Sequence, residues 1–360
     1  MWTTAAMSSP ILVCEKCSKL GAITCAHGQP DVPAPYVIPT RVKPNLPHDA
    51  RLDDSLLRGY SLQGEIGSGA TSTVYKGIQR ESGKIVAVKV LSKSIAKNEA
   101  MIERFKKEAY ISSQLFSPYT VWTLDYGLLL DGRPFMVMDF IEGKSAGDLV
   151  EEEGAVSLER ALPIFFQIAT GLADAHAHGI MHRDIKPDNV MLVEENDMRD
   201  WVKIIDFGIA KSYVGLSEPD AESTGEFAEE SLGLTHSGVV IGSPLYMSPE
   251  QCLGSAIDHR TDVYSFGCFM YEMLTGYSVF EASSAENMLF KHIYEIPVAM
   301  SEKAPSLTLH SEELLSRVEQ IVRRALAKDP DNRYQLASDI RIDLRACINL
   351  LPTSQPLPLD

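Results

Sequence analysis

Apolar residues come in short runs in some parts of the chain and at helical spacing in others. Short runs rich in β-branched residues predict strands at 60–66, 85–90, 135–143, 190–193 and 202–205. Apolar residues three or four positions apart predict helices at 158–178, 262–274, 314–326 and 336–350. Residues 102–109, rich in Glu, Lys and Arg, predict one more helix between the second and third of these strands.

The first 58 residues carry no apolar periodicity. Prolines crowd residues 30–47, which predicts an extended or disordered linker. Ahead of them lie Cys14-x-x-Cys17 and Cys25-x-His27, whose three thiols and one imidazole could supply four zinc ligands. We favour reduced cysteines in a flexible tail, because the Cys25–His27 spacing is tight for a zinc finger and matches this short often arise by chance.

Composition excludes several classes of protein. The chain has 360 residues with a net charge of -16, which argues against a binder of nucleic acid or of anionic membranes. No apolar run approaches the ~18 residues that cross a bilayer, and the start of the chain does not resemble a signal peptide. Six cysteines fit a reducing compartment better than a disulfide scaffold. We therefore expect a cytoplasmic protein without a membrane span.

One stretch concentrates chemical groups that neither a core nor a plain turn requires. Residues 182–189 read His-Arg-Asp-Ile-Lys-Pro-Asp-Asn, just before the strand at 190–193. In phosphoryl transfer a carboxylate orients the attacking hydroxyl and accepts its proton, a cation balances phosphate charge, and an amide oxygen helps to hold Mg²⁺. Asp184, Lys186 and Asn189 offer these groups. The stretch resembles the catalytic loop of the protein kinase family.

Further motifs extend the resemblance over roughly residues 60–345, in the order in which the family has them. They are a glycine-rich hairpin at 67–75, a lysine-bearing strand at 85–90, Asp206-Phe207-Gly208 and Ser248-Pro249-Glu250. Lys186, two residues after Asp184, is the form typical of serine/threonine kinases. Residues 242–251 are similar to those of the bacterial eukaryotic-like kinases.

The resemblance implies an α+β fold, the two-lobed protein-kinase fold. A small antiparallel β-sheet lobe with one helix is expected at 59–143, and a larger, mainly helical lobe at 144–347. A Cys-containing, Pro-rich tail at 1–58 and a short tail at 348–360 would flank this domain.

The resemblance also implies a role for each matching residue. Asp184, Lys186 and Asn189 would be catalytic, Asn189 and Asp206 would hold Mg²⁺, and Lys89 would position ATP while pairing with Glu108. The adenine would bond the backbone of Asp139 and Ile141, in the segment between the lobes. The other nucleotide contacts are expected from Ile66, Gly67, Gly69, Val74, Ala87, Met138 and Met191.

Single motifs also admit plainer interpretations. Glycine pairs such as Gly67 and Gly69 also make ordinary turns, and Ser72 stands at the family's third glycine. Lys89 alone could be an edge-strand lysine that reaches water, and Asp206 alone could close a β-turn. The conjunction of ordered motifs favours the kinase interpretation over each of these.

The resemblance implies two structural pairings in the helical part. Glu250 would form an ion pair with Arg333, and Asp262 would hold the backbone of the catalytic loop. His176 and His178 are interpreted as residues of a helix end rather than as metal ligands.

The segment between Gly208 and Met247 is the expected activation segment. Its insert, 217–231, is acidic and has no Lys or Arg, which predicts disorder. The resemblance implies that Arg183 could bind a phosphate on this segment, and that Thr235 and Ser237 are candidate phosphoacceptors. The alternative interpretation is that Thr235 and Ser237 are ordinary polar loop residues, because loops favour Ser and Thr.

These features together predict a serine/threonine protein kinase that transfers the γ-phosphoryl group of ATP, with Mg²⁺, to protein hydroxyls. Protein substrates are the expected partners, with self-association for autophosphorylation. A catalytically inactive pseudokinase scaffold and a small-molecule kinase of related fold remain alternatives. Intact Lys89, Asp184, Asn189 and Asp206 argue against the first, and a peptide platform at 242–250 argues against the second.

Overall fold

The computed structural model describes residues 59–68, 72–93, 96, 98–195, 198–207 and 244–352, apart from the side chains of Ala100, Arg104, Glu108, Thr308 and Leu309. All of them belong to one compact unit of the chain, Leu46–Ser354. The N-terminal tail with its four candidate zinc ligands, the acidic insert and the candidate phosphoacceptors Thr235 and Ser237 lie outside the described residues.

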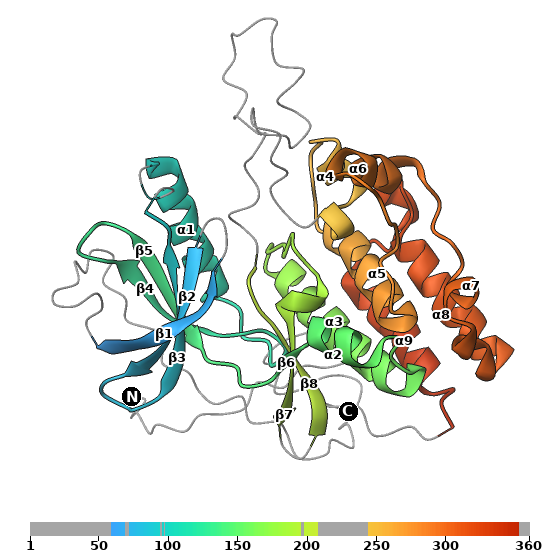
Figure 1. The fold of residues 1–360 in the computed structure, drawn as a ribbon, viewed down its shortest axis with the longest axis horizontal. Coiled ribbons are helices and arrows are strands. Elements are labelled where there is room, and N and C mark those ends of the chain that lie inside the picture. The colour runs from blue at the N-terminus through green and yellow to red at the C-terminus, as the bar shows by residue number, and fades with distance from the viewer. Residues whose placement is uncertain are drawn as a thin grey trace, which may run out of the picture. The chain divides into compact units, whose positions relative to one another are not determined.

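The first described elements form a five-stranded antiparallel sheet with one helix (Figure 1). In spatial order the strands are β1 (Tyr60–Ser68), β2 (Ser72–Gln79), β3 (Ile85–Leu91), β5 (Pro134–Asp139) and β4 (Thr123–Leu128). Helix α1 (Glu99–Ser112) packs against β4 and β5. This is the small lobe that the sequence predicted.

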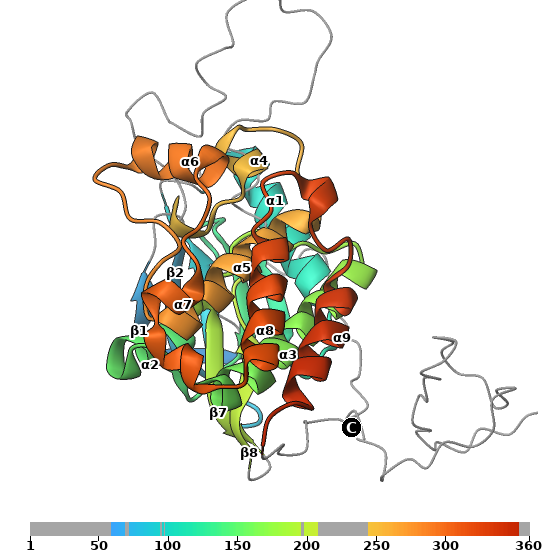
Figure 2. The same cartoon turned by 90° about the vertical axis from the view of Figure 1, so that its right-hand side faces the viewer.

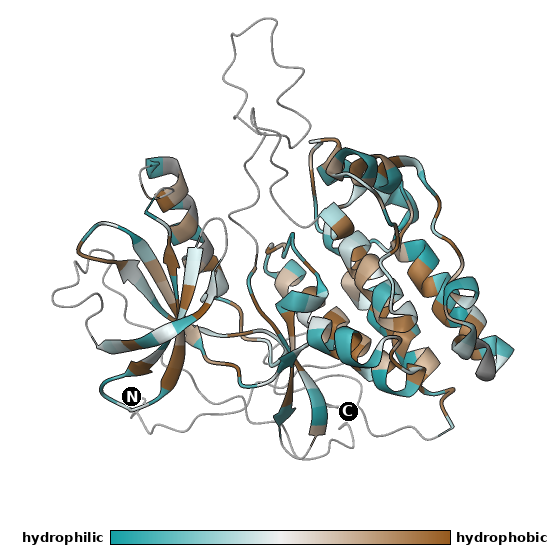
Figure 3. Cartoon of the chain, viewed as in Figure 1, coloured by the Kyte–Doolittle hydropathy of each residue, from teal (hydrophilic) through white to brown (hydrophobic). Residues whose placement is uncertain are grey.

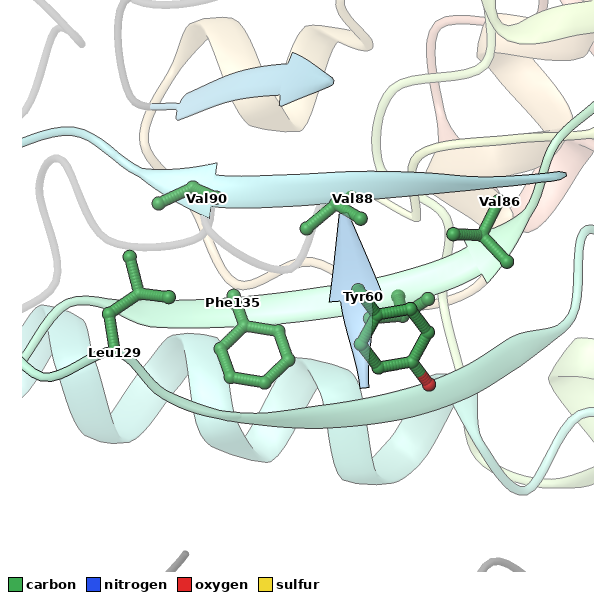
Figure 4. Packing of buried hydrophobic residues seen from close by; sticks show 7 residues of the cluster. Tyr60, Val86, Val88, Val90, Leu129 and Phe135 are labelled. Atoms are coloured by element: carbon green, nitrogen blue, oxygen red, sulfur yellow. The ribbon is translucent and has the colours of Figure 1, made fainter. Parts of the chain in front are cut away.

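Alternation along β3 assigns its side chains to two different apolar clusters. One cluster lies on the side of the sheet shown in Figure 4 and contains Tyr60, Val86, Val88, Val90, Leu129, Phe135 and Val137. The other includes residues of α1 and contains Ala87, Leu91, Phe105, Ala109, Met136 and Met138. Lys89 alternates with Ala87 and Leu91 and therefore shares their face. A slip of one residue would turn its ammonium into the valine cluster, so burial fixes the register.

A second, three-stranded sheet carries the chain past the catalytic loop. Its strands are β6 (Lys144–Ser145), β7 (Val190–Glu195) and β8 (Met198–Ile204), in that order. The hairpin β7–β8 pairs Val190 with Ile204. The residues just before β7 and just after β8 are therefore neighbours, although the hairpin separates them in sequence.

The rest of the described chain is mainly helical (Figure 2). The helices are α2 (Ala146–Glu153), α3 (Leu158–Ala177), α4 (Pro249–Cys252), α5 (Arg260–Thr275), α6 (Ala285–Tyr294), α7 (Met300–Lys303), α8 (Glu312–Ala325) and α9 (Ala337–Ile348). α9 contacts both α3 and α8, and α5 packs on α8. α5 and α8 approach each other closely at Gly267. A Cβ added to this glycine would lie only 3.0 Å from the Cβ of Ala325.

The helices differ in how much of their surface is apolar (Figure 3). α5 is buried along nearly its whole length, from Thr261 to Thr275, with only Glu272 partly exposed. α8 buries one stripe, Leu314, Val318, Ile321, Val322 and Ala325, and exposes charged residues on its other side. Central α5 is therefore the helix onto which α2, α3, α7 and α8 pack.

The predicted elements are all present, but some differ in their bounds: β8 begins at Met198 rather than at 202, and α1 extends three residues beyond 102–109 at each end. The predicted strand at 135–143 is wrong at its end, because β5 stops at Asp139. At that residue the N–H donates to Trp122 O, and the ladder with β3 ends at the pair Val86–Asp139. The predicted helices agree to within two residues at most boundaries.

Two absences concern the described residues alone. No helix among them is long and apolar enough to span a membrane. The cysteines among them, Cys252, Cys268 and Cys347, are buried and have free thiols.

Candidate active site

Buried Asp262 on α5 holds the backbone of the catalytic loop. Its carboxylate accepts the N–H of His182 at 2.8 Å and the N–H of Arg183 at 2.6 Å. Arg183 has a φ of 65°, a left-handed conformation that costs free energy for a residue with a side chain. The two hydrogen bonds offset this strain. Burial alone would raise the pKa of Asp262, but its hydrogen bonds and the nearby histidines lower it below its ordinary value.

His182 connects the catalytic loop to the end of β8. It is fully buried; Nδ1 accepts the Asp184 N–H at 3.3 Å, and Nε2 lies 2.9 Å from Ile205 O. These partners require the proton on Nε2 and a neutral ring. Burial lowers the pKa of His182, which agrees with that assignment. The Phe207 ring packs on it with 4.6 Å between centroids.

Asp184, Lys186 and Asn189 converge within this loop. Asn189 donates its side-chain amide to the Asp184 carbonyl at 2.8 Å and to Asp184 Oδ2 at 2.9 Å. Lys186 Nζ lies 3.9 Å from the same carboxylate oxygen and 3.7 Å from Asp188 Oδ2. The short helix Pro187–Asn189 supports this geometry, with Asn189 N–H donating to Lys186 O at 3.0 Å.

Asp206 meets both the catalytic loop and the first sheet. Ile205 N–H donates to Asn189 O at 2.9 Å, which aligns the chain before Asp206 with the loop. Lys89 Nζ donates to Asp206 Oδ1 at 2.9 Å. Asp206 has a φ of 54°, a strained conformation of the kind that occurs at functional sites. The structure therefore brings Lys89, Asp184, Asn189 and Asp206 together, as the sequence predicted.

An apolar face adjoins these polar groups. Val74 pairs with Lys89, and Ala87 pairs with Met138, across neighbouring strands. Val74, Ala87 and Met138 belong to one apolar cluster. Gly67 lies directly opposite Val74 in the β1–β2 hairpin.

For the other predicted nucleotide contacts the structure gives positions for some residues only. Ile66 is 50% exposed at the end of β1, and Met191 lies in β7 opposite Ser145. Gly69 and the side chain of Glu108 lie outside the described residues, so the predicted Lys89–Glu108 pair stays a prediction.

The donors near Asp206 suit a hard divalent cation. Asn189 uses its amide nitrogen on Asp184, so its oxygen is the atom left for a metal. Carboxylate and amide oxygens are ligands that Mg²⁺ prefers, completed by water and phosphate oxygens. Within the described ranges no group of three or more His, Cys, Asp or Glu could hold a metal ion. A site of one carboxylate and one amide agrees with that finding.

The sequence did not indicate three contacts, two of which involve the catalytic loop or Asp262 and one of which fixes the segment before α4 to α5. His176 Nε2 lies 2.8 Å from Asp262 Oδ2, so this histidine is a buried hydrogen-bond partner and more than a helix-end residue. Gln251 Nε2 donates to Arg183 O at 3.3 Å, and Tyr246 OH donates to Glu272 Oε2 at 2.5 Å. Each contact joins residues far apart in the chain, and local sequence patterns carry no signal of such pairs.

The predicted ion pair Glu250–Arg333 is confirmed. The guanidinium contacts Glu250 Oε1 at 2.7 Å and Oε2 at 2.8 Å, and it also donates to Ala327 O, Arg260 O and Lys328 O. Burial would raise the pKa of Glu250, but Arg333 and Thr261 lower it below the ordinary value. The pair fixes α4, and with it the segment that precedes α4, to the helical lobe.

Comparison with known proteins agrees with this site. A family model described as the protein kinase domain matches residues 60–341. Serine/threonine-protein kinase pkn3 of Myxococcus xanthus is 33% identical over 80% of this chain and 49% of its own length. Serine/threonine-protein kinase PknB of Mycolicibacterium smegmatis is 34% identical over 79% of this chain and 42% of its own length. The chain thus spans about half the length, or less, of these relatives.

Solved structures agree in fold. The kinase domain of PknI from Mycobacterium tuberculosis superposes with a TM-score of 0.60 at 22% identity, covering 84% of this chain and 99% of that one. Rad53 in complex with AMP-PNP has a TM-score of 0.60 at 27% identity, covering 79% of this chain and 64% of that one. The predicted two-lobed fold is confirmed, and the chain belongs to the protein kinase family, with serine/threonine kinases of bacteria among its relatives.

Proposed function

We propose that this protein is a serine/threonine protein kinase that transfers the γ-phosphoryl group of ATP to hydroxyls of protein substrates in bacterial signal transduction. The observation that carries the proposal is the convergence of Asp184, Asn189, Asp206 and Lys89, with Asn189 bonded to Asp184 and Lys89 bonded to Asp206. No structural requirement of the helical lobe explains four such groups in one place.

In this mechanism Asp184 accepts a hydrogen bond from the substrate hydroxyl, aims its oxygen at the phosphorus, and finally accepts its proton. Asn189 holds the Asp184 carboxylate in place for that step. Lys186, close to the same carboxylate, balances the negative charge that develops on the transferred phosphoryl group. Mg²⁺ would be held by Asn189 and Asp206, and it supplies charge neutralisation on the phosphates.

ATP would lie against the apolar face of Val74, Ala87 and Met138, with Lys89 on its α- and β-phosphates. Since the Asp139 N–H is already bonded to Trp122 O, the Asp139 carbonyl is the group left for the adenine. The N–H of Ile141 is the second proposed contact, and Ile66, Gly67 and Gly69 would cover the nucleotide. Glu108, on α1, would pair with Lys89.

A phosphorylation assay with ATP, Mg²⁺ and a generic basic protein tests the proposal. Phosphate on Ser or Thr of that protein, dependent on Asp184, is the expected result. No transfer to protein, despite ATP binding, would favour a pseudokinase scaffold. Turnover of a small molecule in place of protein would favour a small-molecule kinase of related fold.

A further inference from the structure

A buried histidine lies beneath the segment that would carry a peptide substrate. His292, on α6, is fully buried, and its Nδ1 lies 3.0 Å from Tyr264 OH on α5. The Phe280 ring packs edge-on against the imidazole with 5.1 Å between centroids. α6 contacts the short helix Pro244–Tyr246, which lies within the expected peptide platform.

Lys328 sets the direction of the hydrogen bonds around this histidine. An ammonium donates and never accepts. Lys328 Nζ donates to His292 O at 2.7 Å and to Tyr264 OH at 3.3 Å. The Tyr264 oxygen accepts from Lys328, so its own hydrogen can go to Nδ1 of His292 at 3.0 Å or to the His292 carbonyl at 3.5 Å, and the shorter contact favours Nδ1. The proton of the neutral imidazole then lies on Nε2.

Nε2 of His292 faces the platform. It is buried and forms no hydrogen bond within the described part of the chain. The backbone carbonyls of Pro244 and Leu245 lie close enough to favour a proton on the ring, but neither has the geometry of a formed bond to Nε2. Burial and then the charge of Lys328 lower the pKa of His292 to about 3, so the ring is neutral at pH 7. A buried donor without an acceptor costs free energy, and a small shift of the platform would satisfy it.

The other end of the platform is already fixed. Ser265 donates its hydroxyl to Tyr246 O at 2.8 Å, and Tyr246 OH donates to Glu272 at 2.5 Å. The carbonyls of Pro244 and Leu245, which precede Tyr246, accept no such side-chain hydrogen bond among the described residues, and His292 is the side-chain donor nearest to them.

We propose that His292 is a positioning residue for protein substrates, whose Nε2–H donates to the carbonyl of Pro244 or Leu245 when a substrate segment lies on the platform. The inference rests on the proposed kinase function and adds a residue 108 positions after Asp184 to that site. His292 touches neither ATP nor the acceptor hydroxyl. It acts through the platform backbone, so its loss weakens the use of protein substrate and leaves the use of ATP unchanged.

A matched pair of variants separates this role from packing. In His292→Gln the amide nitrogen reaches the place of Nε2 and keeps the donor to the platform. In His292→Asn the amide reaches only the place of Nδ1, so the acceptor for Tyr264 is kept and the platform donor is lost. We expect His292→Asn to raise KM for a peptide substrate roughly five- to tenfold, as for one lost hydrogen bond. KM for ATP should stay within about twofold, and His292→Gln should stay close to the wild type.

Equal peptide KM values in the two variants, or parallel changes in KM for ATP, would overturn the proposal. The tautomer provides a second test that needs no activity and no variant. Nitrogen-15 NMR of His-labelled wild-type protein should detect the proton on Nε2 of His292, and a proton on Nδ1 would overturn the assignment. A wild-type protein without any phosphotransfer would refute the proposed function, whereas the NMR result would still report on the platform donor.

Discussion

The side-chain amide of Asn189 bonds Asp184 twice, at the backbone carbonyl (2.8 Å) and at the carboxylate (2.9 Å). Both bonds use the amide nitrogen, so the amide oxygen is directed to other partners. One residue therefore holds the proposed base and is also the proposed ligand of Mg²⁺. This coupling ties the position of the base to the position of the metal.

Asp184→Asn should lower kcat by several orders of magnitude and leave ATP affinity nearly unchanged. The change removes a group that acts in the transition state, and it places two amides against each other at Asn189. Steady-state kinetics and calorimetric titration with ATP and Mg²⁺ would measure the two effects. Asp188→Asn is the matched control, because Asp188 is 71% exposed in the same loop and should lose less than about tenfold. Wild-type autophosphorylation in Asp184→Asn would contradict the proposed mechanism.

Lys89→Met should weaken ATP binding and reduce the rate. Lys89 Nζ is held 2.9 Å from Asp206, and its side chain is only 13% exposed, so its charge acts in a partly desolvated site. Lys84→Met is the control, since Lys84 makes a similar contact to Asp139 but is 51% exposed. We expect the control variant to bind ATP like the wild type in the same titration. Equal ATP affinities for the two variants would argue against the role of Lys89.

Local motifs made much of this site predictable. Asp184, Lys186 and Asn189 lie within one loop, and Asp206 follows one apolar strand, so residue type and spacing sufficed. The lysine of β3 was predictable because one cation in an apolar strand requires a partner. The face on which Lys89 lies then follows from alternation alone.

Contacts between distant segments were not predictable from patterns. His176 and Asp262 are 86 residues apart, and the bond between them depends on how α3 packs beside α5. The end of β5 at Asp139 coincides with the last pair of its ladder with β3, Val86–Asp139, and no local rule connects these two residues. Glu250–Arg333 was expected only from the family resemblance, because two charges 83 residues apart have no joint signal in one sequence.

Phosphorylation of the activation segment should raise activity toward protein substrates. Arg183 is fixed in the loop through its N–H to Asp262 and its carbonyl to Gln251, and an arginine there can bind a phosphate. We propose Thr235 and Ser237 as the phosphoacceptors. Mass spectrometry of wild-type protein and of Asp184→Asn should find phosphate there in the wild type alone. Full activity in the double variant Thr235→Ala/Ser237→Ala would rule out regulation by phosphorylation at these two residues.

Breaking the Glu250–Arg333 pair should destabilise the helical lobe by about 3–5 kcal/mol, because the remaining charge stays buried without its partner. Glu250→Ala tests this by thermal or urea unfolding. Glu313→Gln removes the exposed i,i+4 partner of Arg317 on α8 and should cost about 0.5 kcal/mol or less. Similar losses in both variants would show that the buried pair is not specially stabilising.

Stability should depend on pH through His292. Its folded pKa of about 3 lies far below the ordinary value of about 6.5 expected when the chain is unfolded. Between these two values the unfolded chain binds a proton that the folded protein excludes, so the free energy of unfolding falls as pH falls, by about 1.4 kcal/mol per pH unit from this one group. Above pH 6.5 the contribution is fully present and constant.

Other groups titrate in the same range, including the fully buried His182, whose pKa is also lowered. The difference between wild type and His292→Gln isolates the single histidine, because the other groups are common to both proteins. Urea unfolding at pH 7.5, 6.0 and 5.0 would measure the free energy of unfolding of both proteins. As pH falls, the wild type should lose stability relative to His292→Gln. Across the step from pH 6.0 to 5.0 the shift should be about 1 kcal/mol. If the difference stays constant over all three pH values, His292 takes up a proton as readily in the folded protein as in the unfolded chain. The buried arrangement of Lys328, Tyr264 and His292 then does not exclude the proton.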